Sequence, residues 1–192
     1  MGVFEDLGVM VDGLEDDTAE EFGGDVEEIF RFDVSLTPEQ DIEIGVVIAE
    51  LEVEDYPEFG EEYSLLAHTF ADLITEHIGT YTENLMLAVA DLPELDVDLT
   101  DEERAILADE ETNEDGSVLL YSFPVIIMDD EDEEDGKNLG AGFNRSLKAD
   151  VMRKIYGGEF EEAEDSYQDL VTDAVLDHGV LFLKAVEAIQ KL

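Results

Sequence analysis

Two acidic segments carry oxygen-bearing side chains at spacings that resemble the start of a calcium-binding loop. Residues 111–116 read ETNEDG and residues 131–136 read EDEEDG, so each segment places acidic or amide side chains at alternate positions before a glycine. An EF-hand loop also needs a bidentate glutamate at its twelfth position, where these segments have Ser122 and Gly142. We therefore interpret both segments as solvated loops and leave open whether they bind cations specifically.

The three histidines, His68, His77 and His178, are the other candidate metal ligands. His68 and His77 lie nine residues apart in one predicted helix, which places them on opposite faces. The Glu-x-x-His pairs of a di-iron helix bundle do not occur, and the chain has no cysteine to act as a thiolate ligand. We therefore predict no metal ion and no cofactor, and interpret each histidine as a partly buried side chain with ordinary hydrogen bonds.

The sequence also lacks the short motifs that accompany covalent or phosphate chemistry. It contains no Gly-x-Ser-x-Gly nucleophile elbow, no phosphate-binding Gly-x-x-x-x-Gly-Lys loop and no dinucleotide-binding glycine pattern. Paired carboxylates are uninformative here, because 54 of the 192 residues are Asp or Glu. We therefore expect a protein that is not an enzyme and predict no catalytic residue.

A locally basic window between Lys137 and Tyr156 is the clearest anomaly in the charge pattern. It holds five of the nine basic residues and a single acid, Asp150, in a chain whose net charge is −45. The five basic residues are Lys137, Arg145, Lys148, Arg153 and Lys154.

Two hypotheses explain this window. Its side chains either contact an acidic surface of another subunit or pair with acids of the same chain. On an ideal helix the basic side chains point in different directions, so the window has no single basic face. The sequence therefore disfavours nucleic acid as the partner.

The C-terminal segment, Phe160 to Leu192, has apolar residues at helical spacing and predicts one long helix, or two collinear helices that meet near Gly179. Four consecutive residues in it are apolar and would point in every direction around the helix. They are Val180, Leu181, Phe182 and Leu183. We predict that this part of the helix is an interface or lies centrally in the core.

Three segments have the pattern of strands. The sheet that they form, together with the helices, must hold the candidate residues described above in place. Residues 29–36 alternate between apolar and polar side chains, residues 42–53 are apolar and β-branched, and residues 117–128 form the most strand-like run. We expect the first two to form a hairpin within a small antiparallel sheet. Pro124 lacks an N–H donor, so the third strand is predicted to be an edge strand or to be bulged there.

The remaining elements are predicted to be helices. Thr80 with Glu83 and Thr100 with Glu103 have the spacing of capping boxes, so each pair predicts a helix start. The predicted helices cover residues 61–78, 80–92, 101–108, 143–156 and 160–192. The LMLAVA run in the second of these predicts a largely buried helix, with a strand over 81–92 as the alternative. Strands and helices together predict an α+β fold.

The chain divides into an N-terminal arm and one domain. Residues 1–24 combine weak helical periodicity with several glycines, and Gly23 and Gly24 separate them from the first predicted strand. The arm is predicted either to fold back on its own core as a short helix or to dock on a neighbouring subunit. Residues 25–192 are predicted to form a single α+β domain.

The charge of −45 indicates the solvent in which the protein works. Salt at 1 M shortens the Debye length to about 3 Å, which removes most of the self-repulsion that opposes a compact state. The hydrophobic fraction of 44% is high enough for a core, so the acidity does not indicate disorder. We therefore expect a protein of a halophile.

We expect a cytoplasmic or virion location for this protein. Glu5 and Asp6 stand where a signal peptide needs positive charge, and no apolar run reaches the length of a membrane span. The expected function is that of a structural or adaptor subunit of a larger assembly in a halophilic archaeon, with the head, neck or tail of a haloarchaeal virus as one setting. Its partners are then protein subunits, in a homo-oligomer or a multi-component assembly.

Two other functions stay open at this stage. One is a cytoplasmic regulatory or binding module that recognises a protein or a small ligand. The other is an enzyme that uses carboxylates with Mg²⁺. Stoichiometry, the identity of the partner and a viral or cellular origin do not follow from the residues.

Folding is expected to require concentrated salt, because the negative charge is spread over the whole chain and needs general screening. Circular dichroism during dialysis from molar KCl to about 50 mM NaCl should show loss of structure, as the Debye length grows beyond about 10 Å. Full cooperative structure at the lower salt concentration would contradict this expectation.

Overall fold

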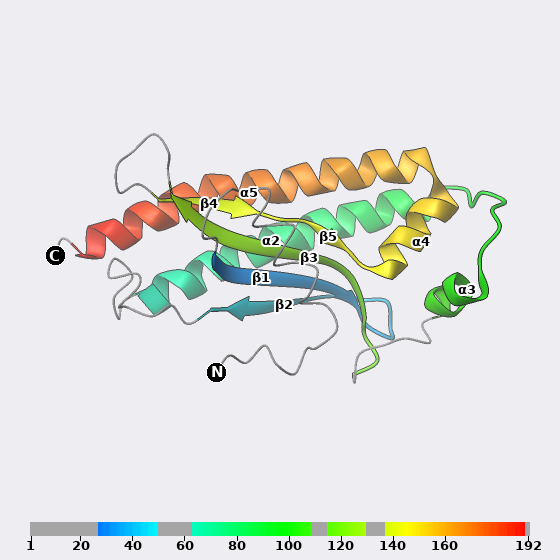
Figure 1. Ribbon diagram of the computed structural model, residues 1–192, viewed down its shortest axis with the longest axis horizontal. Helices are drawn as coiled ribbons and strands as arrows, with labels where there is room; N and C mark the ends of the chain where they lie inside the picture. The colour runs from blue at the N-terminus through cyan, green and yellow to red at the C-terminus, as the bar shows by residue number, and fades with distance from the viewer. Residues whose placement is uncertain (1–26, 50–62, 109–114, 130–136, 191–192) are drawn as a thin grey trace.

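The computed structural model describes residues 27–49, 63–108, 115–129 and 137–190 (Figure 1). The predicted arm at 1–24 lies outside the described residues, as do residues 50–53 of the second predicted strand. Residues 111–114 and 131–136 of the calcium-like segments are also outside them.

The described strands form one antiparallel sheet, which confirms the predicted α+β class. Its order is β2-β1-β3-β4, and a short fifth strand also pairs with β3. The strands are β1 (Glu27–Leu36), β2 (Ile42–Ile48), β3 (Val118–Asp129), β4 (Lys137–Ala141) and β5 (Asn144–Arg145).

The alternation in β1 sets the orientation of the sheet. Phe30, Phe32 and Val34 are completely buried, while Arg31 and Asp33 lie on the other face. The predicted hairpin to β2 is present, and it closes through the backbone of residues 37–41. Apolar residues at every second position thus fix which face of the sheet carries the core.

β3 is a central strand and its register shifts against β1 do not fall at Pro124, so both predictions for Pro124, an edge strand and a bulge, are wrong. β3 pairs with β1 on one side and with β4 and β5 on the other. The Pro124 carbonyl accepts a hydrogen bond from the Gly142 amide at 2.8 Å. The N and O atoms of a strand residue point to the same side, so the missing donor of Pro124 faces the break between β4 and β5.

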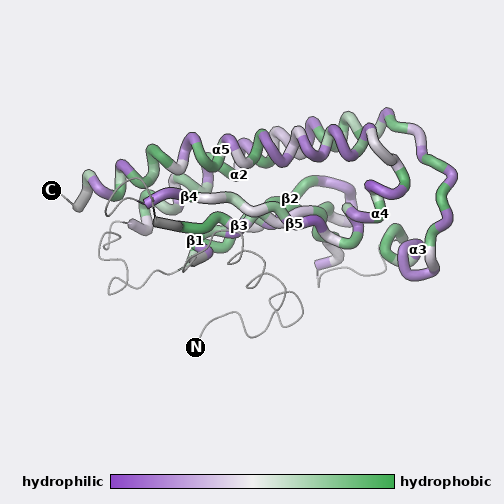
Figure 2. Tube along the Cα trace, turned by 45° about the horizontal axis from the view of Figure 1, so that its top comes forward, coloured by the Kyte–Doolittle hydropathy of each residue, from purple (hydrophilic) through white to green (hydrophobic). Residues whose placement is uncertain are grey.

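Two long antiparallel helices, α2 (Tyr63–Ala90) and α5 (Gly158–Gln190), cover one face of the sheet (Figures 1 and 2). The core lies between them and the sheet. Phe70 packs at a ring distance of 4.9 Å from Phe30 and 5.0 Å from Phe182, which joins the sheet to both helices. A second aromatic cluster contains Tyr121, Phe123, Phe143 and Tyr167.

α2 is one continuous helix, whereas the sequence predicted two helices with a new start at Thr80. The Thr80 hydroxyl donates to the Glu76 carbonyl at 3.1 Å, so it does not cap a helix. A threonine and a glutamate at capping-box spacing begin a helix only where the chain is already broken, and Gly79 alone does not break it.

The LMLAVA run is helical, which decides between the two predicted alternatives. It is not buried all round, because Leu85 and Val89 face the core while Leu87 is 69% exposed. One face of this helix lies against the sheet and the other faces solvent.

The shorter helices lie at one end of the sheet (Figure 1). The capping box of Thr100 and Glu103 is confirmed at the start of α3 (Asp101–Leu107). The next helix, α4 (Leu147–Tyr156), begins after the N-cap Ser146 and not at Phe143 as predicted. The reason is that Phe143 packs in the aromatic core and residues 144–145 pair with β3.

α5 follows the first of its two predicted alternatives, a single helix through Gly179. An alanine Cβ at this position would lie 3.0 Å from Leu139 Cδ1, so the glycine allows α5 to lie closely on β4. Among the described residues, no helix combines the length and the apolar character needed to cross a membrane.

The two interior helix glycines give a matched test of this packing. Gly79→Ala should raise the free energy of unfolding by about 0.5–1 kcal/mol, because alanine favours a continuous helix and its Cβ would lie 3.6 Å from Ile44 Cδ1, an ordinary contact. Gly179→Ala should not raise the free energy of unfolding, because the close contact of the added Cβ with Leu139 offsets the gain in helix propensity. Urea unfolding in molar KCl measures both, and a Gly79→Ala protein no more stable than the parent would contradict an unbroken α2.

Candidate functional site

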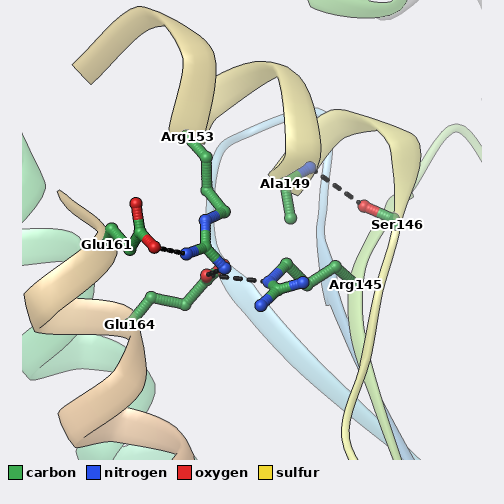
Figure 3. A network of polar contacts seen from close by, with 6 residues as sticks. All are labelled: Arg145, Ser146, Ala149, Arg153, Glu161 and Glu164. Carbon is green, nitrogen blue, oxygen red and sulfur yellow. Dashed lines mark hydrogen bonds and ion pairs between the residues drawn. The ribbon is translucent and has the colours of Figure 1, made fainter. Parts of the chain in front are cut away.

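The basic window centres on one buried acid, Glu164 of α5 (Figure 3). Arg145 Nε donates to Glu164 Oε2 at 2.9 Å, and Arg153 Nη1 lies 3.0 Å from the same oxygen. Arg153 Nη2 also lies 2.6 Å from Glu161 Oε1. Two of the five predicted basic residues are therefore brought together around acids of the same chain.

Local chain geometry produces this convergence. Arg145 ends β5, and the next residue, Ser146, caps α4 by accepting from the Ala149 amide at 3.2 Å (Figure 3). Arg153 follows two turns later on α4. Gly157 then adopts a φ of 69° and ends α4, so that the chain turns directly into α5 and brings Glu164 back between the two arginines.

The charges of Arg145 and Arg153 are balanced by those of Glu161 and Glu164. The Glu164 side chain is completely buried, while Arg145 and Arg153 keep 32% and 19% of their side-chain surface exposed. A buried carboxylate without partners would be strongly destabilising, so the guanidinium groups are required for Glu164 to occupy this place. The contact fixes β5 and α4 against α5.

A buried hydroxyl, that of Tyr121, borders the carboxylate. Burial, and then the negative charge of Glu164, raise the pKa of Tyr121 far above its usual range. Neither the Tyr121 hydroxyl nor Glu164 Oε1 has a hydrogen-bond partner of good geometry among the described residues. The phenol therefore stays protonated, and Glu164 itself is closed off from solutes.

Tyr167 joins this cluster to α2. Its hydroxyl lies 2.8 Å from Thr82 Oγ1, which donates its own proton to the Ile78 carbonyl at 2.7 Å. Tyr167 is therefore the donor to Thr82. Burial raises the pKa of Tyr167, so this hydroxyl also stays neutral. The cluster as a whole has the chemistry of a fixed ion-pair network.

Lys154 makes the third contact within the chain. Its Nζ lies 2.9 Å and 2.8 Å from the two carboxylate oxygens of Glu103, which links α4 to the capping box of α3. The hydrogen bond from Lys154, followed by that from the Thr100 amide, lowers the pKa of Glu103. α3 is thereby held to α4 by a residue that also starts α3.

The other two predicted basic residues lie elsewhere. Lys137 begins β4, in register with Asp129, and Lys148 lies in the first turn of α4. The window is therefore not one continuous surface. Three of its residues make the contacts that the hypothesis of internal pairing expects, and an intersubunit contact of the window stays a prediction.

No family model, no curated protein and no solved structure matches this chain.

The apolar segment of α5 divides between core and solvent. Phe182 is 5% exposed and packs against Phe30 and Phe70, and Leu183 is half-buried. Val180 and Leu181 are 47% and 64% exposed. The same four residues therefore anchor α5 to the sheet and leave apolar surface outside.

One pair of side chains was not predicted from the sequence. His77 of α2 and His178 of α5 meet with their Nε2 atoms 3.0 Å apart, whereas Nδ1 of His68 lies 2.7 Å from the Ser64 carbonyl of its own helix. The periodicity places both residues on helices, but their meeting depends on how α2 and α5 align. The described residues contain no group of three or more His, Asp or Glu side chains arranged for a metal ion.

Removing the charge of Glu164 tests the role of the ion-pair network. Glu164→Gln should lower the free energy of unfolding by about 3 kcal/mol, near the lower end for broken buried pairs, because the arginines stay partly hydrated. Urea unfolding in molar KCl measures this loss.

Glu162→Gln is the matched control, because it removes the same charge from an exposed position on the same helix. It should change stability by less than about 0.5 kcal/mol. Equal effects of the two substitutions would show that the network does not hold the fold.

Proposed function

We propose that this protein is a non-enzymatic structural or adaptor subunit, and that a protein partner covers the outward side of α5. The observation that carries the proposal is the exposure of three apolar side chains within two turns of that helix. Leu176 is 40% exposed, Val180 is 47% exposed and Leu181 is 64% exposed. We call these three residues the α5 apolar strip.

The charge of the protein makes this strip informative. In a chain with a net charge of −45, an outward helix position is commonly acidic, as at Glu162, Asp165 and Asp169 earlier in α5. In molar salt, attraction between exposed charges is screened within about 3 Å. Stable association in that solvent must therefore depend on apolar burial, and the α5 apolar strip offers it.

The ion-pair network supports the same proposal. Arg145, Arg153 and Lys154 contact acids within the chain. These contacts join β5 and α4 to α5, and α3 to α4. The α5 apolar strip itself lies beside Phe182, whose ring packs against Phe30 and Phe70, so a partner on this part of α5 meets a surface that is anchored to the core.

We place this subunit in the cytoplasm of a halophilic archaeon or in the particle of a virus that infects one. The support for this setting is the net charge of −45, which requires concentrated salt in the surrounding medium. Its partners in the proposal are protein subunits, either further copies of this chain or other components.

A second candidate function is a module that binds an extended segment of a protein. The feature that favours it is β2, which is an edge of the sheet formed by the described residues. Val46 and Val47 on this strand are both 37% exposed, so the edge has apolar side chains beside its backbone groups. Such an edge accepts a further strand by main-chain hydrogen bonds.

Acidic substitutions on α5 test the main proposal. The double variant V180E/L181E should keep the melting temperature of the parent within a few degrees and should have a smaller native mass in molar KCl. Phe182→Glu should instead unfold the protein, because its ring lies in the core. Sedimentation velocity and light scattering give the masses.

Leu87→Glu is the matched control, since Leu87 is 69% exposed in the last turn of α2, on another helix than the α5 apolar strip. It should retain the mass of the parent. The proposal would be overturned if the parent neither self-associated at any concentration nor bound the proteins isolated with it. It would also be overturned if the V180E/L181E variant had the same native mass as the parent.

A further inference from the structure

His77 and His178 form a contact between two helices from distant parts of the chain. Their Nε2 atoms lie 3.0 Å apart across 101 residues of sequence, and their ring centroids lie 5.0 Å apart with an interplanar angle of 28°. Both side chains are half-buried. The contact is a hydrogen bond, so one of the two nitrogens carries a proton; once an ion displaces that proton, the pair can supply two of the four ligands of a tetrahedral site.

A third side chain orients one of the rings. The Tyr81 hydroxyl lies 3.4 Å from Nδ1 of His77, and the Tyr81 ring stacks on the His77 ring with centroids 5.8 Å apart. If Nδ1 carries the proton and faces the tyrosine oxygen, Nε2 presents its lone pair towards His178. Metal-bound histidines are commonly held in this way by a polar group on the second nitrogen.

We propose that His77 and His178 bind one divalent transition metal ion, which bridges α2 and α5 on the helix side of the protein. A zinc-like ion with nitrogen ligands at about 2.0–2.1 Å holds two such nitrogens about 3.3 Å apart in tetrahedral geometry. The observed separation is 3.0 Å, so binding requires the two nitrogens to move slightly apart and the rings to turn until both lone pairs point at the ion.

The ligand type defines the class of ion. Imidazole nitrogen favours Zn²⁺, Ni²⁺ and Cu²⁺ over Mg²⁺ and Ca²⁺, which prefer oxygen. Because the described residues supply no third His, Asp or Glu to this pair, water completes the coordination. The ion is therefore exchangeable.

The many carboxylates of the chain define the main difficulty of a test, since they bind cations without specificity. The three histidines resolve it. His77→Gln and His178→Gln each remove one ligand, and His68→Gln is the matched control because His68 is exposed and is bonded to its own helix. Mg²⁺ at the same concentration reports binding to carboxylates.

The experiment measures melting temperature in molar KCl with Ni²⁺, with Mg²⁺ or with a chelator. Ni²⁺ should raise the melting temperature of the parent and of His68→Gln by at least about 2 °C over the Mg²⁺ value. Both His77→Gln and His178→Gln should lose this rise. An equal rise in all four proteins, or none in the parent, would overturn the proposal.

A spectroscopic measurement makes the assignment independent of stability. With one equivalent of Cu²⁺, the electron paramagnetic resonance spectrum of the parent should show hyperfine coupling to two imidazole nitrogens. The spectrum of His178→Gln should lose at least one of these couplings, and that of His68→Gln should match the parent. A parent spectrum without nitrogen coupling, as expected for copper held by carboxylate and water oxygens, would contradict a site at the histidine pair.

Discussion

The carboxylate of Glu164 lies in the interior between two guanidinium groups, and the end of the fold that carries α3 and α4 depends on this contact. Arg145 comes from the last residue of β5, Arg153 from α4 and Glu164 from α5. The three elements follow one another along the chain, and the contact fixes the angle at which each turns into the next. Lys154 then extends the same support to α3 through Glu103.

This use of positive charge matters because only nine residues are basic. Each cation that is held against an interior or well-ordered acid lowers the repulsion at that place without help from the solvent. Salt screens such partly buried pairs less than it screens the exposed acids of the rest of the chain. The contacts around Glu164 therefore give local electrostatic support that depends less on ionic strength.

The parts of the fold that follow from local pattern were predictable, and the parts that depend on alignment were not. The alternation of β1 and the capping box of α3 are local, and both are present. The false helix start at Thr80 shows the limit of a motif whose meaning depends on a break in the chain. The prediction for Pro124 was wrong for a related reason, since its missing donor faces the break between β4 and β5. The candidate sites show the same division. The sequence identified Arg145 and Arg153, but Glu164 is one of 54 acidic residues and has no local signature. The meeting of His77 with His178 depends on the axial alignment of α2 and α5, because hydrophobic periodicity gives the face of a helix and not its position along a neighbour.

The strand order also determines how the protein folds in time. β1 lies between β2, its neighbour in sequence, and β3, which pairs with it from about 90 residues further on, as in the contact of Asp33 with Ser122 across 89 positions. Such long-range pairing is slow because loop closure precedes the contacts that stabilise it. During synthesis β1 and β2 leave the ribosome before β3. α2, the next long element along the chain, is therefore the first that can cover the face with Phe30 and Phe32. The hairpin and α2 thus form the natural first unit of folding, and completion of the sheet waits for the second half of the chain.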